Sequence, residues 1–327
     1  MGGFACSSWY FLRFASPHED AAAFDPGAVR YWLPVDLYVG GAEHAVLHLL
    51  YARFWTKVMY DSGLIDFDEP FTKLLNQGQL MGLDGQRMSK SRGNVITPDK
   101  IAETYGTDAL RVYVMFMAPF DQDVNWSMEG INGSRRFLNR LRLLYKETFT
   151  ASKAAPGADP ELERLLHRVI RGVSERMESL RFNTMIALIM EFTNTLAERQ
   201  RRDAWRTRTF HQALDTLLLL IAPSVPHIAE ELWQLTGHNG SIHLAAWPTW
   251  DAELARQEMI QVAIQVNGKL RDVMEVAEEL DQEEVIALAR TQIRLLEALW
   301  GKRVARVVYV PGKIINFVVS KEAANVL

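Results

Sequence analysis

The sequence contains very little cysteine and no long apolar run. Cys6 is the only cysteine among 327 residues, which excludes an internal disulfide and a cysteine-clustered zinc site. The most apolar stretch, Leu217 to Ala222, is followed by Pro223 and Pro226 and is far shorter than the roughly 18 residues of a membrane helix. No basic residue precedes Arg13, which argues against a secretory or transit leader. These absences predict a cytoplasmic protein with no membrane segment.

The composition is that of a globular protein with an uneven distribution of charge. Hydrophobic residues make up 48% and charged residues 23% of the chain, and this length favours two or three domains. A net charge of −4 argues against a general nucleic-acid binder. Residues 128–208, however, hold 16 basic against 10 acidic residues, and the remainder holds 20 against 30. The segment is either a surface for a polyanion or a solvated helical face.

The first third of the chain reads as an α/β unit. A short apolar run at 35–39 predicts a buried strand that stops at Gly40-Gly41, and the pattern at 42–60 predicts the helix that follows. A second strand is expected at 71–80, then a glycine-bounded loop at 82–94 and a short helix at 98–104.

The middle and the tail have different periodicities. Apolar spacing and short connections predict a helical bundle; its helices are expected at 108–117, 128–146, 161–179, 182–201, 207–221 and 226–235. The small-residue stretch 151–160 predicts a linker. Hairpins around Asn267-Gly268 and Pro311-Gly312, with a helix at 281–299 between them, predict a small ββαββ unit.

The loop at 82–94 carries most of the chemistry that local sequence can suggest. Between Gly85 and Asn94 it holds three cations and two serine hydroxyls, a donor-rich composition that suits phosphate oxygens. It is not a Walker loop, since no GxxxxGK[ST] spacing is present. Without further information, a basic loop is simply exposed to solvent in most proteins.

Glu43, His44 and His48 form a second group of candidate functional residues. On a helix the two histidines lie one turn apart on one face, with Glu43 beside them. This arrangement resembles part of a zinc protease site, but the glutamate precedes the first histidine and no third ligand is evident. Two satisfied core histidines are the simpler alternative.

Several motifs resemble one enzyme family. Met88-Ser89-Lys90-Ser91, followed by Arg92-Gly93-Asn94, resembles the KMSKS signature of class I aminoacyl-tRNA synthetases, with Arg87 in place of its first lysine. The segments 38–54, 181–184 and 222–227 are similar to leucyl-tRNA synthetases and occur in the same order. The resemblance runs from residue 1 to about 320.

The resemblance implies ATP-dependent attachment of leucine to tRNA(Leu) through a leucyl-adenylate. Charge that develops on the departing pyrophosphate would be met by Lys90, a point cation on a flexible stem. The implied catalytic residues are Arg87, Ser89, Lys90 and Ser91. The implied ATP site, which takes ATP with Mg²⁺, comprises Gly41, Glu43, Met88 and Lys90. The implied leucine site comprises Ser7, Tyr10, Glu43, His44 and His48.

The resemblance also implies a tRNA-binding surface and three domains. The basic residues expected to contact tRNA phosphates are Arg135, Arg136, Arg140, Arg142, Lys269 and Lys313. The implied fold is a partial Rossmann-type α/β catalytic domain at 1–127, an all-α anticodon-binding-type bundle at 128–257 and a small α+β tail domain at 258–327.

The His-x-Gly-His signature of this family does not occur in the sequence. The resemblance is therefore to the C-terminal part, without the half that carries that signature and without the editing domain. We expect the chain to need an N-terminal synthetase half or subunit for activity. Two alternatives are a non-catalytic tRNA-binding module that retains the loop and, less in keeping with the motifs, a zinc hydrolase built on His44 and His48.

Overall fold

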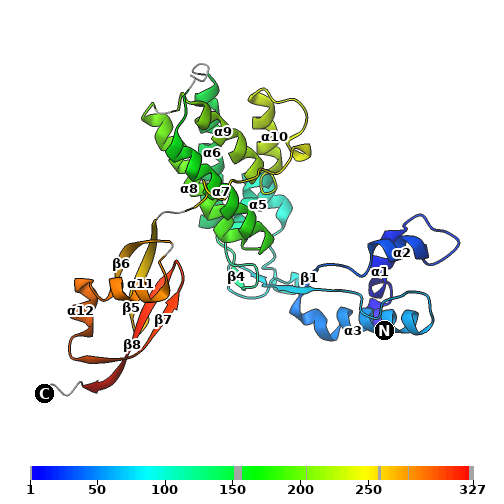
Figure 1. Ribbon diagram of the computed structural model, residues 1–327. Helices are drawn as coiled ribbons and strands as arrows, with labels where there is room; N and C mark the ends of the chain where they lie inside the picture. The colour runs from blue at the N-terminus through cyan, green and yellow to red at the C-terminus, as the bar shows by residue number, and fades with distance from the viewer. Residues whose placement is uncertain (1, 151–156, 204, 257–258, 279, 324–327) are drawn as a thin grey trace. The chain divides into compact units, whose positions relative to one another are not determined.

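The computed structural model describes residues 2–150, 157–203, 205–256, 259–278 and 280–323. The chain divides into two compact units, Met1–Thr249 and Trp250–Leu327 (Figure 1). Most of the linker predicted at 151–160 and the domain boundary predicted at 257/258 lie outside the described residues. In those that are described, no helix is long and apolar enough to cross a membrane.

The first part of unit one consists of short helices around a small apolar core. Its elements are η1 (Gly2–Phe4), η2 (Cys6–Ser8), α1 (Tyr10–Ala15), α2 (Pro26–Trp32), β1 (Tyr38–Gly41), η3 (Ala42–Val46), α3 (His48–Asp61) and β2 (Leu74–Gln77). Phe11, Leu12, Val29 and Ala52 are among the buried residues that join α1, α2 and α3. β1 pairs in parallel with β2, so Gly40 and Gly41 lie at the carboxyl end of a parallel strand pair.

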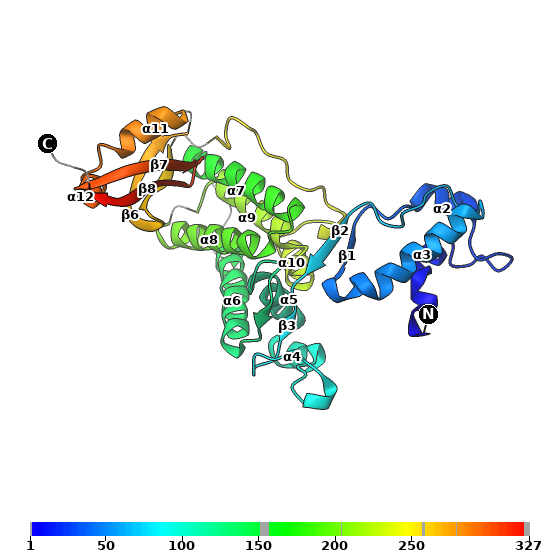
Figure 2. The same cartoon turned by 90° about the horizontal axis from the view of Figure 1, so that it is seen from below.

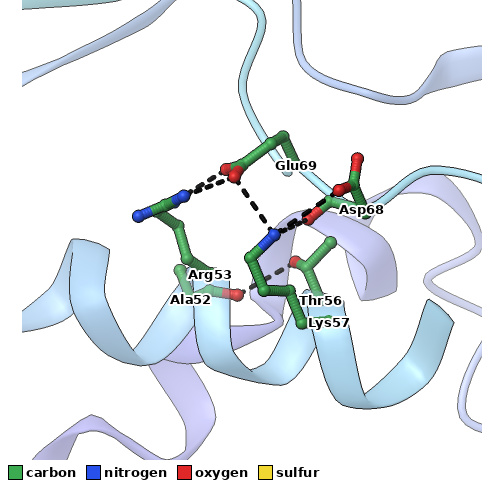
Figure 3. Close-up of polar contacts among 6 residues, drawn as sticks. All are labelled: Ala52, Arg53, Thr56, Lys57, Asp68 and Glu69. Carbon is green, nitrogen blue, oxygen red and sulfur yellow. Dashed lines mark hydrogen bonds and ion pairs between the residues drawn. The ribbon is translucent and has the colours of Figure 1, made fainter. Parts of the chain in front are cut away.

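A cluster of charged side chains ties α3 to the chain that leads into β2 (Figure 3). The Arg53 Nε donates to the Glu69 carboxylate at 2.7 Å, and the Lys57 ammonium lies 3.2 Å from Glu69 and 3.5 Å from Asp68. These pairs link the chain between α3 and β2 to the exposed side of the helix.

The strand predicted at 71–80 is two short strands with different partners. β2 pairs with β1, whereas β3 (Leu80–Met81) pairs in parallel with β4 (Val124–Asn125). The chain changes partner at Gly78, where an added Cβ would lie 2.0 Å from the carbonyl oxygen of Gln122. The close backbone approach at this point requires glycine and prevents one continuous strand.

A loop and two helices connect these strands to the bundle. The signature loop, residues 82–94, contains one 3-10 turn, η4 (Lys90–Arg92), and is followed by α4 (Pro98–Tyr105) and α5 (Thr107–Phe116). The helices predicted at 98–104 and 108–117 are confirmed to within one residue. Pro98 occupies the first turn of α4, where its missing N–H costs no hydrogen bond.

The bundle predicted for the middle of the chain is confirmed. Its helices are α6 (Met128–Thr150), α7 (Pro160–Glu178), α8 (Phe182–Arg201), α9 (Arg208–Ile221) and α10 (Pro226–Leu235), followed by η5 (Ile242–Leu244). Figure 2 shows α7, α8 and α9 side by side. Asp159 and Thr207 cap the N-termini of α7 and α9 with their side-chain oxygens.

Unit two is a four-stranded mixed sheet with two helices. The elements are β5 (Met259–Val266), β6 (Lys269–Ala277), α11 (Gln282–Ala289), α12 (Ile293–Leu299), β7 (Lys302–Val310) and β8 (Ile314–Ala323). The strand order is β6-β5-β8-β7, with β5 and β8 parallel. The single helix predicted at 281–299 is wrong. Ala289 and Leu295 are both buried against the sheet, and one straight helix would point them about 120° apart.

Candidate functional site

A cleft of about 490 Å³ lies where β1, the signature loop and the end of α5 meet. Its lining includes Gly41, Glu43, His44, Gln77, Gly78, Gln79, Leu80, Arg87, Met88, Val114, Met117, Phe120, Gln122 and Val124. Charged groups of both signs and three amide side chains line the same space. The cleft therefore suits a ligand that carries both hydrogen-bond donors and acceptors.

Glu43 is the acidic group of this cleft. Its carboxylate accepts a hydrogen bond of 3.1 Å from Arg87 and one of 3.4 Å from the Gln79 amide. Hydrogen bonding to its own backbone N–H, with help from Arg87, His44 and Gln79, lowers the pKa of Glu43. A Cβ on Gly41 would lie 2.3 Å from the carboxylate. Glycine at this position lets the Glu43 side chain fold back against the end of β1.

A smaller pocket of about 260 Å³ shares Gly41, His44 and Gln77 with the cleft. On it lies a chain of three hydrogen-bonded side chains: the Tyr38 hydroxyl is 2.9 Å from that of Tyr10 and 2.6 Å from His48 Nε2. The Tyr38 ring stacks on Phe71. Burial, together with the hydrogen bond to Tyr10, raises the pKa of Tyr38, so its phenol stays protonated and fixes the His48 ring.

His44 and His48 both line this pocket, but the backbone between them differs from the predicted helix. The helix expected at 42–60 is wrong at its start: η3 ends at Val46, and Leu47 breaks the helical path with φ −117° and ψ −108° before α3 begins. The two rings are nevertheless 6.1 Å apart, edge to face. A straight helix would turn Glu43 and His48 about 140° apart. The break lets Glu43 line the cleft while both histidines line the pocket.

The protonation state of His48 follows from its burial. Burial and the neighbouring His44 lower the pKa of His48, which keeps its imidazole neutral at pH 7. The Nδ1 atoms of both rings are buried without a hydrogen-bond partner among the described residues.

Of the other two residues predicted for the leucine site, Tyr10 is connected to the pocket and Ser7 is not. Tyr10 contacts it through the Tyr38 hydroxyl, and its ring lies 6.3 Å from that of His48. Ser7 lines neither the cleft nor the pocket; its hydroxyl donates to the Phe4 carbonyl at 3.1 Å.

The signature loop divides into a part that faces the cleft and a part that does not. Arg87 and Met88 line the cleft, and Met88 packs against the core formed by Ile101 and Trp126. Ser89, Lys90 and Ser91 are outside the cleft lining, with Lys90 and Ser91 exposed. The two serine hydroxyls lie 3.2 Å apart. In this conformation the structure brings Arg87 and Met88, and not Lys90, to Glu43.

Metal binding finds little support at this site. In the described part of the chain, no three His, Cys, Asp or Glu side chains lie close enough together to hold a metal ion. The hydrolase alternative thus lacks a third ligand within those residues.

The four arginines of α6 line two different clefts. Arg135 and Arg142, seven residues apart, line one of about 450 Å³ together with His227. Arg136 and Arg140, four residues apart, line one of about 650 Å³ between α5, β4, α6 and α8. Arg142 also donates to Glu231 at 2.6 Å. The basic helix therefore presents two cationic edges instead of one.

The two lysines predicted to contact tRNA lie in unit two. Lys269 begins β6 directly after the Asn267-Gly268 turn, and Lys313 precedes β8 beside Ala263. Both side chains are exposed.

Comparisons with known proteins identify the family to which the chain is similar. Residues 4–127 match the class I tRNA synthetases for isoleucine, leucine, methionine and valine, and residues 159–287 match the anticodon-binding domain of tRNA ligases. The leucine–tRNA ligases of Dehalococcoides mccartyi strain 195 and of Bdellovibrio bacteriovorus are 48% and 44% identical over 98% of the chain. The chain belongs to the leucyl-tRNA synthetase family. It spans about two fifths of the length of these relatives, 39% in each case, and corresponds to their C-terminal part.

Solved structures agree with the family. A ternary complex of the Agrobacterium radiobacter K84 agnB2 leucyl-tRNA synthetase with tRNA and LeuAMS is 36% identical, with a TM-score of 0.75, over 97% of this chain and 42% of that one. A Mycobacterium tuberculosis methionyl-tRNA synthetase, 21% identical with a TM-score of 0.54 over 71% of this chain, shares the fold. The recognition of a class I synthetase fragment followed by an anticodon-binding domain is confirmed.

Sequence reasoning missed three residues that organise this candidate site. Tyr38 connects Tyr10 to His48, Gln79 holds Glu43, and Asn94 holds the signature loop. The only sequence signal for Tyr38 is an aromatic residue just before Gly40-Gly41. Gln79 carries no local signal, because its partner is 36 residues away.

Proposed function

We propose that the chain is the C-terminal part of a leucyl-tRNA synthetase, which forms leucyl-adenylate from leucine and ATP and transfers leucine to tRNA(Leu). The observation that supports this most directly is the pair of adjoining spaces that share Gly41 and His44. One is larger and carries charged groups of both signs beside the signature loop; the other is small and walled by tyrosine and histidine. Two joined substrates, one highly charged and one small, fit such a pair.

The larger cleft is the proposed place for ATP, with Gly41, Glu43, Met88 and Arg87 on its wall. Attack of the leucine carboxylate on the α-phosphorus moves negative charge onto the leaving pyrophosphate, and cations nearby stabilise that charge. Lys90 and Arg87, assisted by Ser89 and Ser91, are the proposed donors. Mg²⁺ commonly binds phosphates and only one or two carboxylates; Glu43 is the carboxylate on this wall, so the ion would be held chiefly by ATP.

The small pocket is the proposed place for leucine. His44 and His48, with Tyr10 acting through Tyr38, would surround the side chain, and Glu43 would accept from the ammonium group or the ribose. Because the pKa of His48 is lowered by burial, its neutral ring does not repel an ammonium. Ser7 is the weakest member of the proposed set, since its hydroxyl is bound to Phe4.

The proposed tRNA surface combines Arg135, Arg136, Arg140 and Arg142 in the bundle with Lys269 and Lys313 in the tail. The proposed domains remain 1–127, 128–257 and 258–327. Cationic side chains on exposed edges suit phosphate contacts, which fix position and carry no sequence information. We also propose that the protein acts in the cytoplasm, since its one cysteine is free and exposed.

An N-terminal synthetase half is the proposed partner for activity. On α3, Leu50 and Phe54 expose 53% and 59% of their surface, and Val58 continues the same stripe. The β1–β2 pair is parallel, and parallel strands normally lie buried on both faces of a larger sheet. Both features suit an apolar partner that covers α3 and adds strands.

The test is leucine-dependent exchange of pyrophosphate into ATP. The chain would be assayed alone and with the separately expressed part of the Dehalococcoides mccartyi leucine–tRNA ligase that it does not match. We expect exchange only in the mixture, and Lys90→Ala should slow it by roughly 10² to 10³. Lys100→Ala, which removes a cation from α4, serves as the matched control. If tRNA binds but no mixture exchanges pyrophosphate, the non-catalytic tRNA-binding module becomes the better description.

A further inference from the structure

The Asn94 side chain bonds to three parts of the signature loop at once. Its carbonyl oxygen accepts from the Ser89 backbone N–H at 2.9 Å. Its amide nitrogen donates to the Asp84 carboxylate at 3.1 and 3.2 Å and to the Arg87 carbonyl at 3.3 Å. One residue at the end of the loop thus joins its start and its middle.

Asp84 completes the arrangement from the other side. Its carboxylate also accepts from the Gln86 backbone N–H at 3.0 Å. A Cβ on Gly82 would lie 2.7 Å from the Asp84 carboxylate and 3.1 Å from the Asn94 amide nitrogen. The pair can form only because the residue beneath it has no side chain.

These bonds separate the loop into a fixed base and a tip. In the base, Arg87 pairs with Glu43 at 3.1 Å and Met88 is packed in the core. The tip, Lys90 to Gly93, forms one 3-10 turn closed by the Gly93 N–H on the Lys90 carbonyl, with Gly93 in the left-handed region at φ 68°. The side chains of the tip are exposed, and the Arg92 guanidinium donates to the Gln86 side-chain oxygen in the base at 3.3 Å. Movement of the tip would break that exposed bond and leave the Asn94 and Asp84 bonds of the base in place.

We propose that Asn94, acting through Asp84, is a positioning residue that fixes both ends of the signature loop and confines its movement to the tip that carries Lys90. The consequence for catalysis rests on the proposed function. Lys90 lies outside the cleft, so it must swing to reach a triphosphate there. With the Asp84–Asn94 pair intact, this swing leaves Arg87 and Met88 in place.

The experiment is limited digestion with trypsin, which can cut after Arg87, Lys90 and Arg92, with each cut quantified by mass spectrometry. Asn94→Asp keeps the shape and the acceptor for Ser89 but turns an oxygen toward the Asp84 carboxylate. We expect cutting after Arg87 to rise about tenfold, the usual effect of losing one hydrogen bond to a charged group. Cutting after Lys90 and Arg92 should change much less.

Two further variants decide the interpretation. Asp84→Asn combined with Asn94→Asp restores an amide facing a carboxylate and should return cutting after Arg87 most of the way to the wild-type rate. Asn76→Asp, at an exposed strand position, is the matched control and should behave as wild type. The proposal would be overturned if Asn94→Asp left the rate of cutting after Arg87 unchanged. It would also be overturned if the double variant, Asp84→Asn with Asn94→Asp, did not lower that rate again.

The catalytic consequence is measured separately in the mixture that exchanges pyrophosphate. Asn94→Asp should lower kcat about tenfold with little change in KM for leucine. The double variant, Asp84→Asn with Asn94→Asp, should recover most of the lost kcat. A wild-type mixture without exchange would count against the proposed function and leave the digestion result intact.

Discussion

The Asp108 carboxylate, on α5, accepts a hydrogen bond of 2.8 Å from the backbone N–H of Ile228 in the first turn of α10. Its other oxygen is 2.8 Å from Nδ1 of His227. Only 5% of the Asp108 side chain is exposed. No side chain adjacent to α10 in sequence caps its N-terminus, so a residue from another helix supplies the acceptor and joins α5 to the bundle.

Asp108→Ala should lower the free energy of unfolding by about 1 to 3 kcal/mol, because it leaves the Ile228 N–H buried without an acceptor. Asp108→Asn keeps an acceptor and should cost less. Denaturant titration of both variants checks the order. His227→Gln is the control, since 71% of that side chain is exposed; a larger loss there than in Asp108→Ala would contradict the capping role.

Tyr38→Phe should destabilise the first part of the chain by about 1 kcal/mol or more, because the Tyr10 hydroxyl and His48 Nε2 both lose a partner. The ring and its stacking on Phe71 are kept. Tyr31→Phe, at a position 79% exposed, is the matched control. Equal unfolding midpoints for the two variants would show that the hydroxyl of Tyr38 carries no net stability.

Glu69 should make stability depend on acid pH. Hydrogen bonds from Arg53 and Lys57 lower its pKa to about 2. A carboxylate with a lowered folded-state pKa stabilises the fold above its unfolded value near 4.5, and this contribution is lost as the pH falls toward 2. The pair is well exposed, so the effect should be well under 1 kcal/mol.

Comparison of Glu69→Gln with wild type measures this effect. The denaturation midpoint of the variant should be lower at pH 7, and the gap should shrink by pH 3. Asp61→Asn, at the last residue of α3, is the control for loss of one carboxylate outside these ion pairs. If the difference in denaturation midpoint between wild type and Glu69→Gln grew as the pH fell, the lowered pKa of Glu69 would be contradicted.

The two edges of α6 should contribute separately to tRNA binding. Arg136→Gln with Arg140→Gln, and Arg135→Gln with Arg142→Gln, each remove two cations from a different cleft. Each lost phosphate contact should reduce the slope of log affinity against log salt by about 0.7 to 0.9. Arg30→Gln with Lys73→Gln removes the same charge elsewhere and should leave the slope unchanged. Filter binding over a salt series distinguishes these outcomes.

Local periodicity predicted most of the helices, because their buried faces repeat along the sequence. The helices from 161 to 235 are confirmed within one or two residues at each end. The errors occur where distant contacts decide the backbone. The close approach of Gln122 to Gly78 divides the predicted second strand in two. Burial of both Ala289 and Leu295 against the sheet divides the predicted tail helix in two.

The candidate site could be predicted as a set of residues but not as a geometry. Glu43 and His48 were identified from one motif as neighbours on a single helix. In the structure the backbone leaves the helical path at Leu47, with Glu43 on the cleft and His48 on the adjoining pocket. The Tyr38 bridge depends on α1 bringing Tyr10 beside β1, 28 residues away. Contacts at such separations have no periodic signature in the sequence.

The parallel pairing of β5 with β8 sets the order in which unit two can be completed during synthesis. The two central strands of its sheet are the first and the last to leave the ribosome. Until β8 emerges, β5 has only β6 beside it and exposes an open edge, a state that favours pairing with other chains. The high sequence separation of this central contact should make unit two fold more slowly than the locally connected helices of the bundle.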